Sequence, residues 1–422
     1  MASKGEKQRS WAAALPTELQ ALLNRLTAAE REELWVELTQ DLDSDDLQLG
    51  EPPISELKEL AAPFLEVTNA ASLARVLNLA LPLHTQRHRD AKAGRVSVRA
   101  LNYYAYKNQA ARYRTFRIAK RARGETREIK APVPGLQRIQ RLLLLCLTAV
   151  FGQGHDSAHG FLPGRSVLTN AQPHADRTFV LNLDLKNFFP ATHIGRVVAV
   201  LQLPPFRLQK QVAYLIANLC CDQGALPQGA PTSPLLTNVV CQRLDRRLRQ
   251  LAARFKCHYT RYADDLTFSS NRHVFGPDFH EALNTVLESE GYEQNLKKQR
   301  LQLPHMRQEV TGVVVNDFPN VPKNFLRQLR AMLHNWKTKG HAVAAQTLAK
   351  KTPQSPSGKA KRPSLNRVVA GKIAYVGMVR GRQDQLYLKL VEQYLKLDCG
   401  DYGDILEAIS IMETVASHEQ RE

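Results

Sequence analysis

The chain has 422 residues, a length that allows two or three domains with sizeable cores. Its six cysteines form no C-x-x-C pair, so neither a zinc cluster nor a disulfide framework is predicted, and the longest apolar run, residues 142–151, is too short to cross a bilayer. A formal net charge of +18 and a pI near 9.7 favour a long polyanion as partner. We therefore expect reduced thiols, a cytoplasmic location and no membrane partner.

The charge is uneven along the chain. Residues 1–85 carry 7 basic and 14 acidic side chains, against 51 and 26 in the remainder. Leucines at three- and four-residue steps between Pro16 and Leu49 predict a helix, and residues 54–81 predict one or two further helices that end at Pro82. We interpret residues 1–85 as an acidic helical extension that docks on the basic body or on another protein.

Aromatic and basic side chains are interleaved between residues 103 and 117. Such a pattern either stacks bases and holds phosphates or is a core stripe with a solvated face, and the sequence leaves both interpretations open. Residues 117–120 and 127–129 then predict two strands joined by a polar turn, and residues 132–149 predict a helix.

Three acidic side chains follow at the ends of predicted strands. Residues 179–184 form an apolar run that delivers Asp184, and residues 259–268 predict a hairpin with Asp264 and Asp265 at its tip. Taken alone, an Asp-Asp turn is an ordinary exposed turn. With Asp184 as a third acid, the carboxylates would repel one another in a dry site, and keeping them ionised requires a cation such as Mg²⁺.

Three stretches resemble reverse transcriptases. Residues 179–190 resemble motif A of that family, the Pro/Gly-rich residues 225–238 are similar to motif B, and the predicted hairpin supplies the remaining acids in the same order. The resemblance implies an α+β fold of the right-hand polymerase kind. Its expected parts are the extension over residues 1–85, fingers over 86–178, a palm with an antiparallel sheet backed by helices over 179–317, and a basic helical thumb over 318–422.

The resemblance also implies a catalytic set. The carboxylates expected to hold two Mg²⁺ ions, with Mn²⁺ as an alternative, are those of Asp184, Asp264 and Asp265. Residues 291–298 resemble motif D, in which a lysine protonates the leaving pyrophosphate. Lys298 is the expected donor and Lys297 its competitor.

Nucleotide contacts are implied for five further residues, which are Lys120, Arg127, Phe189, Gln228 and Gly229. The two cations would clamp the triphosphate, and the aromatic ring would clash with a 2′-hydroxyl and so select deoxynucleotides. The glutamine and the glycine would line the pocket. Solvated hairpin charges and simple core packing are the alternative roles for the cations and the ring.

Two short strings narrow the resemblance to retron reverse transcriptases. Residues 170–174, Asn-Ala-Gln-Pro-His, look like the Asn-Ala-x-x-His signature of that group, and residues 310–312 look like its Val-Thr-Gly signature. A glycine-containing loop before them resembles the template-side loop of the family. The implied nucleic-acid contacts are Arg165, Asn170, His174, Val310, Thr311 and Gly312.

The retron resemblance implies a function. The chain would be an RNA-directed DNA polymerase that copies part of a structured non-coding RNA, starting from a 2′-hydroxyl of that RNA, into single-stranded DNA. The product would be the branched RNA–DNA called msDNA, made from dNTPs, with host RNase H trimming the template and a separate effector protein acting in anti-phage defence. The alternatives are an intron-encoded or abortive-infection reverse transcriptase, and an RNA-binding scaffold or antitoxin.

Overall fold

The computed structural model describes residues 54–88, 94–107, 110–119, 126–351 and 364–397. These residues belong to two compact units, which divide between Pro322 and Lys323. The helix predicted between Pro16 and Leu49 lies outside the described residues, and so does Lys120. Within the described part of the chain, no helix is both long and apolar enough to cross a membrane.

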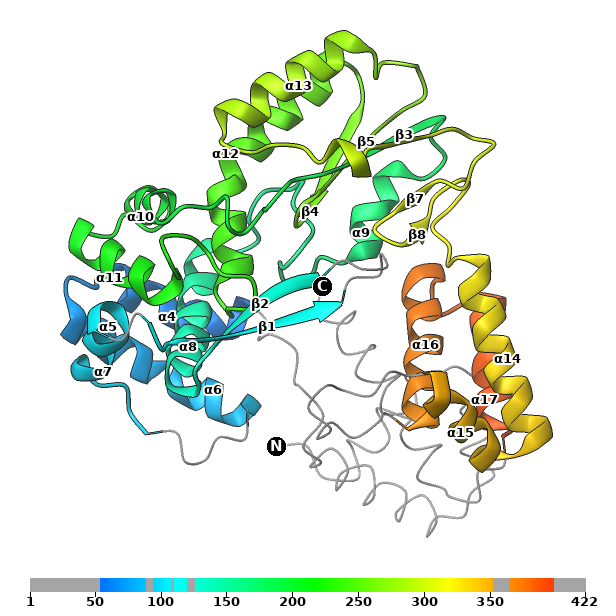
Figure 1. The fold of residues 1–422 in the computed structure, drawn as a ribbon, viewed down its shortest axis with the longest axis horizontal. Helices are drawn as coiled ribbons and strands as arrows, with labels where there is room; N and C mark the ends of the chain where they lie inside the picture. The colour runs from blue at the N-terminus through cyan, green and yellow to red at the C-terminus, as the bar shows by residue number, and fades with distance from the viewer. Residues whose placement is uncertain (1–53, 89–93, 108–109, 120–125, 352–363, 398–422) are drawn as a thin grey trace. The chain divides into compact units, whose positions relative to one another are not determined.

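The first unit begins with a helical region built around the long helix α8. Its elements are α4 (Ile54–Leu65), α5 (Ala70–Leu79), α6 (Leu81–His88), α7 (Val98–Asn102), the π-helix η1 (Tyr103–Lys107), α8 (Pro134–Phe151), α10 (Ile194–Gln202) and α11 (Lys210–Cys220). Figure 1 shows these helices gathered beside α8. Leu57 and Leu77 share one core with Leu142 and Ile216. The described part of the predicted extension is therefore packed into this core.

Helix boundaries in this region follow ordinary capping chemistry. The Asn69 side chain accepts hydrogen bonds from the backbone of Ala71 and Ser72 and so begins α5. The prediction that a helix ends at Pro82 is wrong. Pro82 is the second residue of α6, where a missing backbone N–H costs nothing because the first turn leaves such groups without an intrahelical partner.

The predicted hairpin of residues 117–129 is confirmed, and it is longer than expected. It consists of β1 (Tyr113–Ala119) paired antiparallel with β2 (Thr126–Pro132). The interleaved aromatic and basic stretch contributes to the core through Tyr104 and Tyr113, whereas Tyr106 and Phe116 are exposed. Base stacking by the exposed rings stays a prediction. One of its cations, Arg112, is buried and donates to the backbone oxygens of Tyr104, Asn218 and Cys221.

A four-stranded antiparallel sheet forms the rest of this unit. Its order is β4 (His258–Tyr262), β5 (Asp265–Ser270), β3 (Phe179–Asp184) and β6 (Arg300–Gln302). Helices α12 (Ser233–Arg254) and α13 (Pro277–Ser289) bury one face, which carries Leu183, Leu266 and Phe268. Because strand side chains alternate, the other face carries Asp184, Asp265 and Thr267. On that side lie α9 (Val167–Ala171), the 3-10 helix η2 (Gln172–His174) and the small hairpin of β7 (Glu309–Val310) with β8 (Val313–Val314).

The second unit is helical in its described part, as expected for residues 318–422. It contains α14 (Lys323–Lys339), α15 (His341–Lys351), α16 (Leu365–Arg380) and α17 (Gln385–Leu395). Leu333, Trp336 and Ile373 are among its buried side chains. The predicted α+β class, with an antiparallel sheet backed by helices, is confirmed. The assignment of residue ranges to extension, fingers, palm and thumb remains a prediction.

Candidate active site

The turn between β4 and β5 presents the paired acids. Tyr262 pairs with Asp265, so only Ala263 and Asp264 form the turn. Ala263 has a φ of +55°, in the left-handed region that disfavours side chains with a Cβ. Gly160 lies directly against this turn, where an added Cβ would come within 2.7 Å of the Ala263 nitrogen. Packing therefore imposes a backbone conformation that costs on the order of 1–3 kcal/mol.

A buried ion pair fixes this turn to helix α12. Arg261 is fully buried, and its Nε and Nη2 atoms donate to the two carboxylate oxygens of Asp245 at 2.8 and 2.7 Å. The Tyr259 hydroxyl donates to the same carboxylate at 2.8 Å. The remaining guanidinium nitrogen, Nη1, donates to the Ala263 oxygen at 3.2 Å. Sequence reasoning missed this pair, although a charged residue at an inward position of a buried strand is a usable signal.

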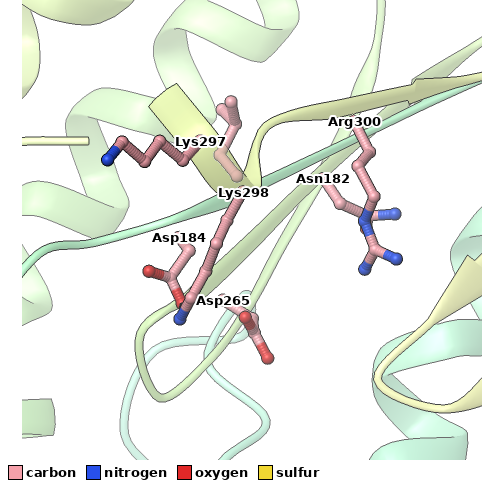
Figure 2. A pocket seen from close by; sticks show the side chains of 7 residues that line it. Asn182, Asp184, Asp265, Lys297, Lys298 and Arg300 are labelled. Atoms are coloured by element: carbon pink, nitrogen blue, oxygen red, sulfur yellow. The ribbon is translucent and has the colours of Figure 1, made fainter. Parts of the chain in front are cut away.

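Asp184 lies opposite the paired acids. The residue ends β3, its register partner across the sheet is Asp265, and it is 7% exposed. The backbone closes the arrangement, because the Leu185 nitrogen donates to the Asp264 oxygen at 2.9 Å. Figure 2 shows the pocket in front of these strands, with a volume of about 350 Å³. Its lining residues are Asn182, Leu183, Asp184, Asp265, Lys297, Lys298 and Arg300.

The two candidate lysines differ in direction. Lys298, on the 3-10 helix η3 (Leu296–Lys298), places its Nζ atom 2.6 Å from Asp184 Oδ2. The Asn295 side chain donates to the other oxygen of this carboxylate at 3.3 Å. Lys297 points away from Asp184 (Figure 2). The geometry therefore favours Lys298 over Lys297 as the cation of the site.

The electrostatics of the site are dominated by crowded negative charge. Burial, reinforced by the charges of Asp264 and Asp184, raises the pKa of Asp265 to about 7. Burial also raises the pKa of Asp264, although the positive charges of Lys298 and Arg127 oppose the shift. For Lys298, burial disfavours the charged form, but the hydrogen bond to Asp184 and the three carboxylates outweigh it and raise its pKa.

These shifts bear on whether the carboxylates fit a divalent metal ion. Oxygen donors from neighbouring strands are the ligand type that Mg²⁺ and Mn²⁺ prefer. The pKa of Asp265 is raised by burial and then by the charges of Asp264 and Asp184, and a cation would offset both effects. As they stand, no three acidic, histidine or cysteine side chains in the described part of the chain converge on one point. The residue types fit the group, and binding would require the carboxylates to turn toward one another.

The predicted nucleotide contacts are partly brought to this site. Arg127, exposed on β2, acts electrostatically on Asp264. Phe189 is half-buried, with its ring centroid 5.4 Å from that of Phe188. The Gln228 oxygen accepts from the Lys130 nitrogen at 2.8 Å, which ties this loop to β2.

Gly229 is explained by backbone packing. Its φ is +121°, and a Cβ there would lie 2.9 Å from the Lys130 oxygen. This close approach to β2 accounts for a glycine before any nucleotide contact is invoked. The nucleotide role of Gly229 stays a prediction.

The two retron-like strings meet inside the protein. His174 is fully buried, with its ring nitrogens 2.7 Å from Ser269 Oγ and 2.8 Å from Thr260 Oγ1. Asn170 is also fully buried, and its amide donates to Thr311 Oγ1 at 3.3 Å. Asn170, His174 and Val310 expose no surface here, and their contact with nucleic acid stays a prediction. They join α9, η2 and β7 to the sheet.

The other predicted nucleic-acid contacts remain accessible in part. Arg165 is half-buried and faces Asp156, with 3.9 Å between Nη2 and Oδ1. Thr311 and Gly312 form the turn between β7 and β8, both with positive φ values of 46° and 88°. Nucleic-acid binding by these three residues stays a prediction.

Comparison with known proteins supplies the class. The family model described as "Reverse transcriptase (RNA-dependent DNA polymerase)" matches residues 118–315, which contain the sheet, the paired acids and the pocket. Two relatives from Myxococcus xanthus, the Retron Mx65 and Retron Mx162 reverse transcriptases, are 36% and 38% identical. The matches cover 62% and 58% of this chain, and they span 65% and 58% of those relatives.

A third relative is matched over most of its own length. The Retron Ec86 reverse transcriptase of Escherichia coli is 32% identical over 62% of this chain and 81% of its own length. The chain therefore belongs to the retron reverse transcriptases. The resemblance expected from the sequence motifs is confirmed.

Proposed function

We propose that this chain is an RNA-directed DNA polymerase whose active site is the pocket beside Asp184. The observation that carries the proposal is the pairing of Asp184 on β3 with Asp265 on β5, beside a turn that holds Asp264. Family membership supports the same activity. The wider proposal, also implied by membership, is synthesis of msDNA on a structured RNA, with host RNase H and a separate effector protein as partners in anti-phage defence.

The proposed chemistry assigns a task to each group. Asp184, Asp264 and Asp265 would hold divalent metal ions, which activate the attacking hydroxyl and neutralise charge on the triphosphate. Lys298 would move from Asp184 Oδ2 to the leaving pyrophosphate and donate a proton to it. Arg127 would hold the triphosphate from the side of the β1–β2 hairpin. The Phe189 ring would lie under the sugar of the incoming dNTP.

The test is extension of a DNA primer on an RNA template by the wild-type protein and by Asp264→Asn. We expect the variant to lose nucleotide addition by at least about a hundredfold while binding the template–primer as tightly as wild type, because binding rests on distributed positive charge. Asp317→Asn is the matched control, since Asp317 is exposed and lies outside the site. Full extension by Asp264→Asn would overturn the proposal.

A second measurement addresses the finer part of the proposal. Nucleic acid extracted from the protein, expressed with the DNA that flanks its gene, should contain short DNA whose mobility changes after RNase or debranching treatment. Unbranched DNA made only on added template would support a general reverse transcriptase. Bound RNA without DNA would support a scaffold.

A further inference from the structure

A basic hollow lies at the end of the four-stranded sheet that is remote from the active site. Its volume is about 260 Å³, and its lining residues are Arg177, Lys256, His258, Ser270, Asn271 and Arg272. Register places it at the Phe179–Ser270 end of the β3–β5 pair, whereas Asp184 and Asp265 are the other end. At about 3.3 Å per residue, the two ends are roughly 17 Å apart. The hollow is therefore a separate site.

Three connecting segments build the hollow, and hydrogen bonds tie them together. Arg177 precedes β3, Lys256 lies between α12 and β4, and Arg272 follows β5. The Asn271 side chain accepts from the Thr178 nitrogen at 3.2 Å. Ser270 Oγ accepts from the Arg272 nitrogen at 3.2 Å and donates to the Lys256 oxygen at 3.3 Å. The backbone that carries the cations is therefore fixed in advance.

Among the described residues, no acidic side chain neutralises the positive charge of the hollow. No acidic side chain lines it, and none of Arg177, Lys256 and Arg272 forms an ion pair with an acid among the described residues. The Nε atom of Arg177 is buried and makes no hydrogen bond within the described structure. Lys256 and Arg272 are exposed and Arg177 is half-buried, so their positive charge is open to an external anion.

The buried His174 is hydrogen-bonded to the strands next to this hollow. His174 bonds to Ser269 and Thr260, which lie on the two strands that lead to the hollow. Three residues later the chain presents Arg177. The hydrogen bonds of His174 therefore link the two strands next to the hollow.

We propose that this hollow binds a phosphate of the RNA backbone at a point outside the template–primer duplex. The proposal rests on the proposed function, because that function makes a structured RNA the protein's nucleic acid. A guanidinium beside two further cations, with no acidic side chain lining the hollow, matches the oxygens of a phosphate, and such contacts orient a nucleic acid without reading its sequence. The site would hold the folded RNA in register while its template segment enters the active site.

The test compares wild type with the triple variant Arg177→Gln, Lys256→Gln, Arg272→Gln. The matched control is Arg207→Gln, Lys210→Gln, Arg246→Gln, which removes the same charge from exposed positions elsewhere in the first unit. Two probes are used, the RNA transcribed from the DNA flanking the gene and a short RNA–DNA template–primer. Melting temperatures of all three proteins establish that they are folded.

We expect the triple variant to bind the structured RNA at least about tenfold more weakly. When the logarithm of the binding constant is plotted against the logarithm of the salt concentration, the slope should be smaller by about 0.7–0.9 for each phosphate that the variant no longer neutralises. Extension of the short template–primer should be unchanged. Equal weakening in the control, or unchanged RNA binding by the triple variant, would overturn the inference. The inference would also be overturned if inorganic phosphate stabilised wild type but not the variant while both proteins bound RNA equally well, because the hollow would then bind free phosphate. If wild type extends no primer, the proposed function fails instead.

Discussion

His174 illustrates how a single buried group couples the fold to pH. Burial, with smaller contributions from nearby positive charges, lowers the pKa of His174 to about 3 from its usual value near 6.5. Between these two values the unfolded chain binds a proton that the folded chain does not. The contribution of this residue to the free energy of unfolding is therefore fully present above pH 6.5, and it is lost as the pH falls toward 3.

We predict that His174→Gln is less stable than wild type at pH 7 by about 1–3 kcal/mol, because two buried hydrogen bonds are disturbed. As the pH is lowered from 6.5 to 4, however, the free energy of unfolding should fall less steeply for the variant than for wild type. The two slopes should differ by up to about 1.4 kcal/mol per pH unit. Denaturant unfolding at a series of pH values measures both. Parallel pH profiles for the two proteins would contradict the assignment of this titration to His174.

Lys298 and Lys297 offer a direct comparison between neighbouring side chains. Only Lys298 reaches Asp184, so Lys298→Ala should lower the rate of nucleotide addition by about 10²–10⁴-fold while leaving primer binding nearly intact. Lys297→Ala is the control and should stay within a few-fold of wild type. Single-turnover addition as a function of pH is the measurement. The decline of the rate at high pH should disappear only in Lys298→Ala. Equal losses of rate in both variants would exclude Lys298 as the proton donor.

At the scale of elements, the β4–β5 hairpin depends on its anchor to α12. Asp245→Asn leaves the buried Arg261 guanidinium without its counter-charge and should cost about 3–5 kcal/mol of stability. The double variant Arg261→Met, Asp245→Leu should recover much of that loss, since apolar groups of similar size replace the pair. Polymerase activity should not recover, because the hydrogen bond to the Ala263 oxygen is gone. Denaturant unfolding and primer extension together separate stability from positioning.

Sequence reasoning succeeds for elements whose signal is local. The hairpin acids and Asp184 were predictable because alternation of apolar residues and a short turn are properties of a few neighbouring residues. The burial of His174 was not predictable from the sequence, because its partners Thr260 and Ser269 lie 86 and 95 residues further along the chain. The buried Arg261–Asp245 pair and the close approach of Gly229 to β2 likewise arise only from tertiary packing.

At the scale of the whole molecule, part of the net positive charge is gathered on one helix of the second unit. Helix α14 of the second unit contains no acidic residue, and its buried face includes Leu329, Leu333 and Trp336. The exposed cations of this helix are Lys323, Arg327, Arg330, Lys337 and Lys339. Like charges one helical turn apart destabilise a helix by a few tenths of a kcal/mol per pair, so this face is suited to a polyanion.

We predict that the triple variant Arg327→Gln, Arg330→Gln, Lys337→Gln weakens binding of the template–primer and lowers the salt slope by about 0.7–0.9 for each phosphate that is no longer neutralised. Fewer nucleotides should be added per binding event, while the rate of the first addition at saturating duplex should be unchanged, because the carboxylate site is intact. The control is again Arg207→Gln, Lys210→Gln, Arg246→Gln. The α14 variant should lose binding of the template–primer, whereas the variant of the basic hollow should lose binding of the structured RNA. The reason is that α14 would bind the duplex and the hollow would bind the folded RNA. A loss of first-addition rate in the α14 variant would instead place this helix in the chemistry of the active site.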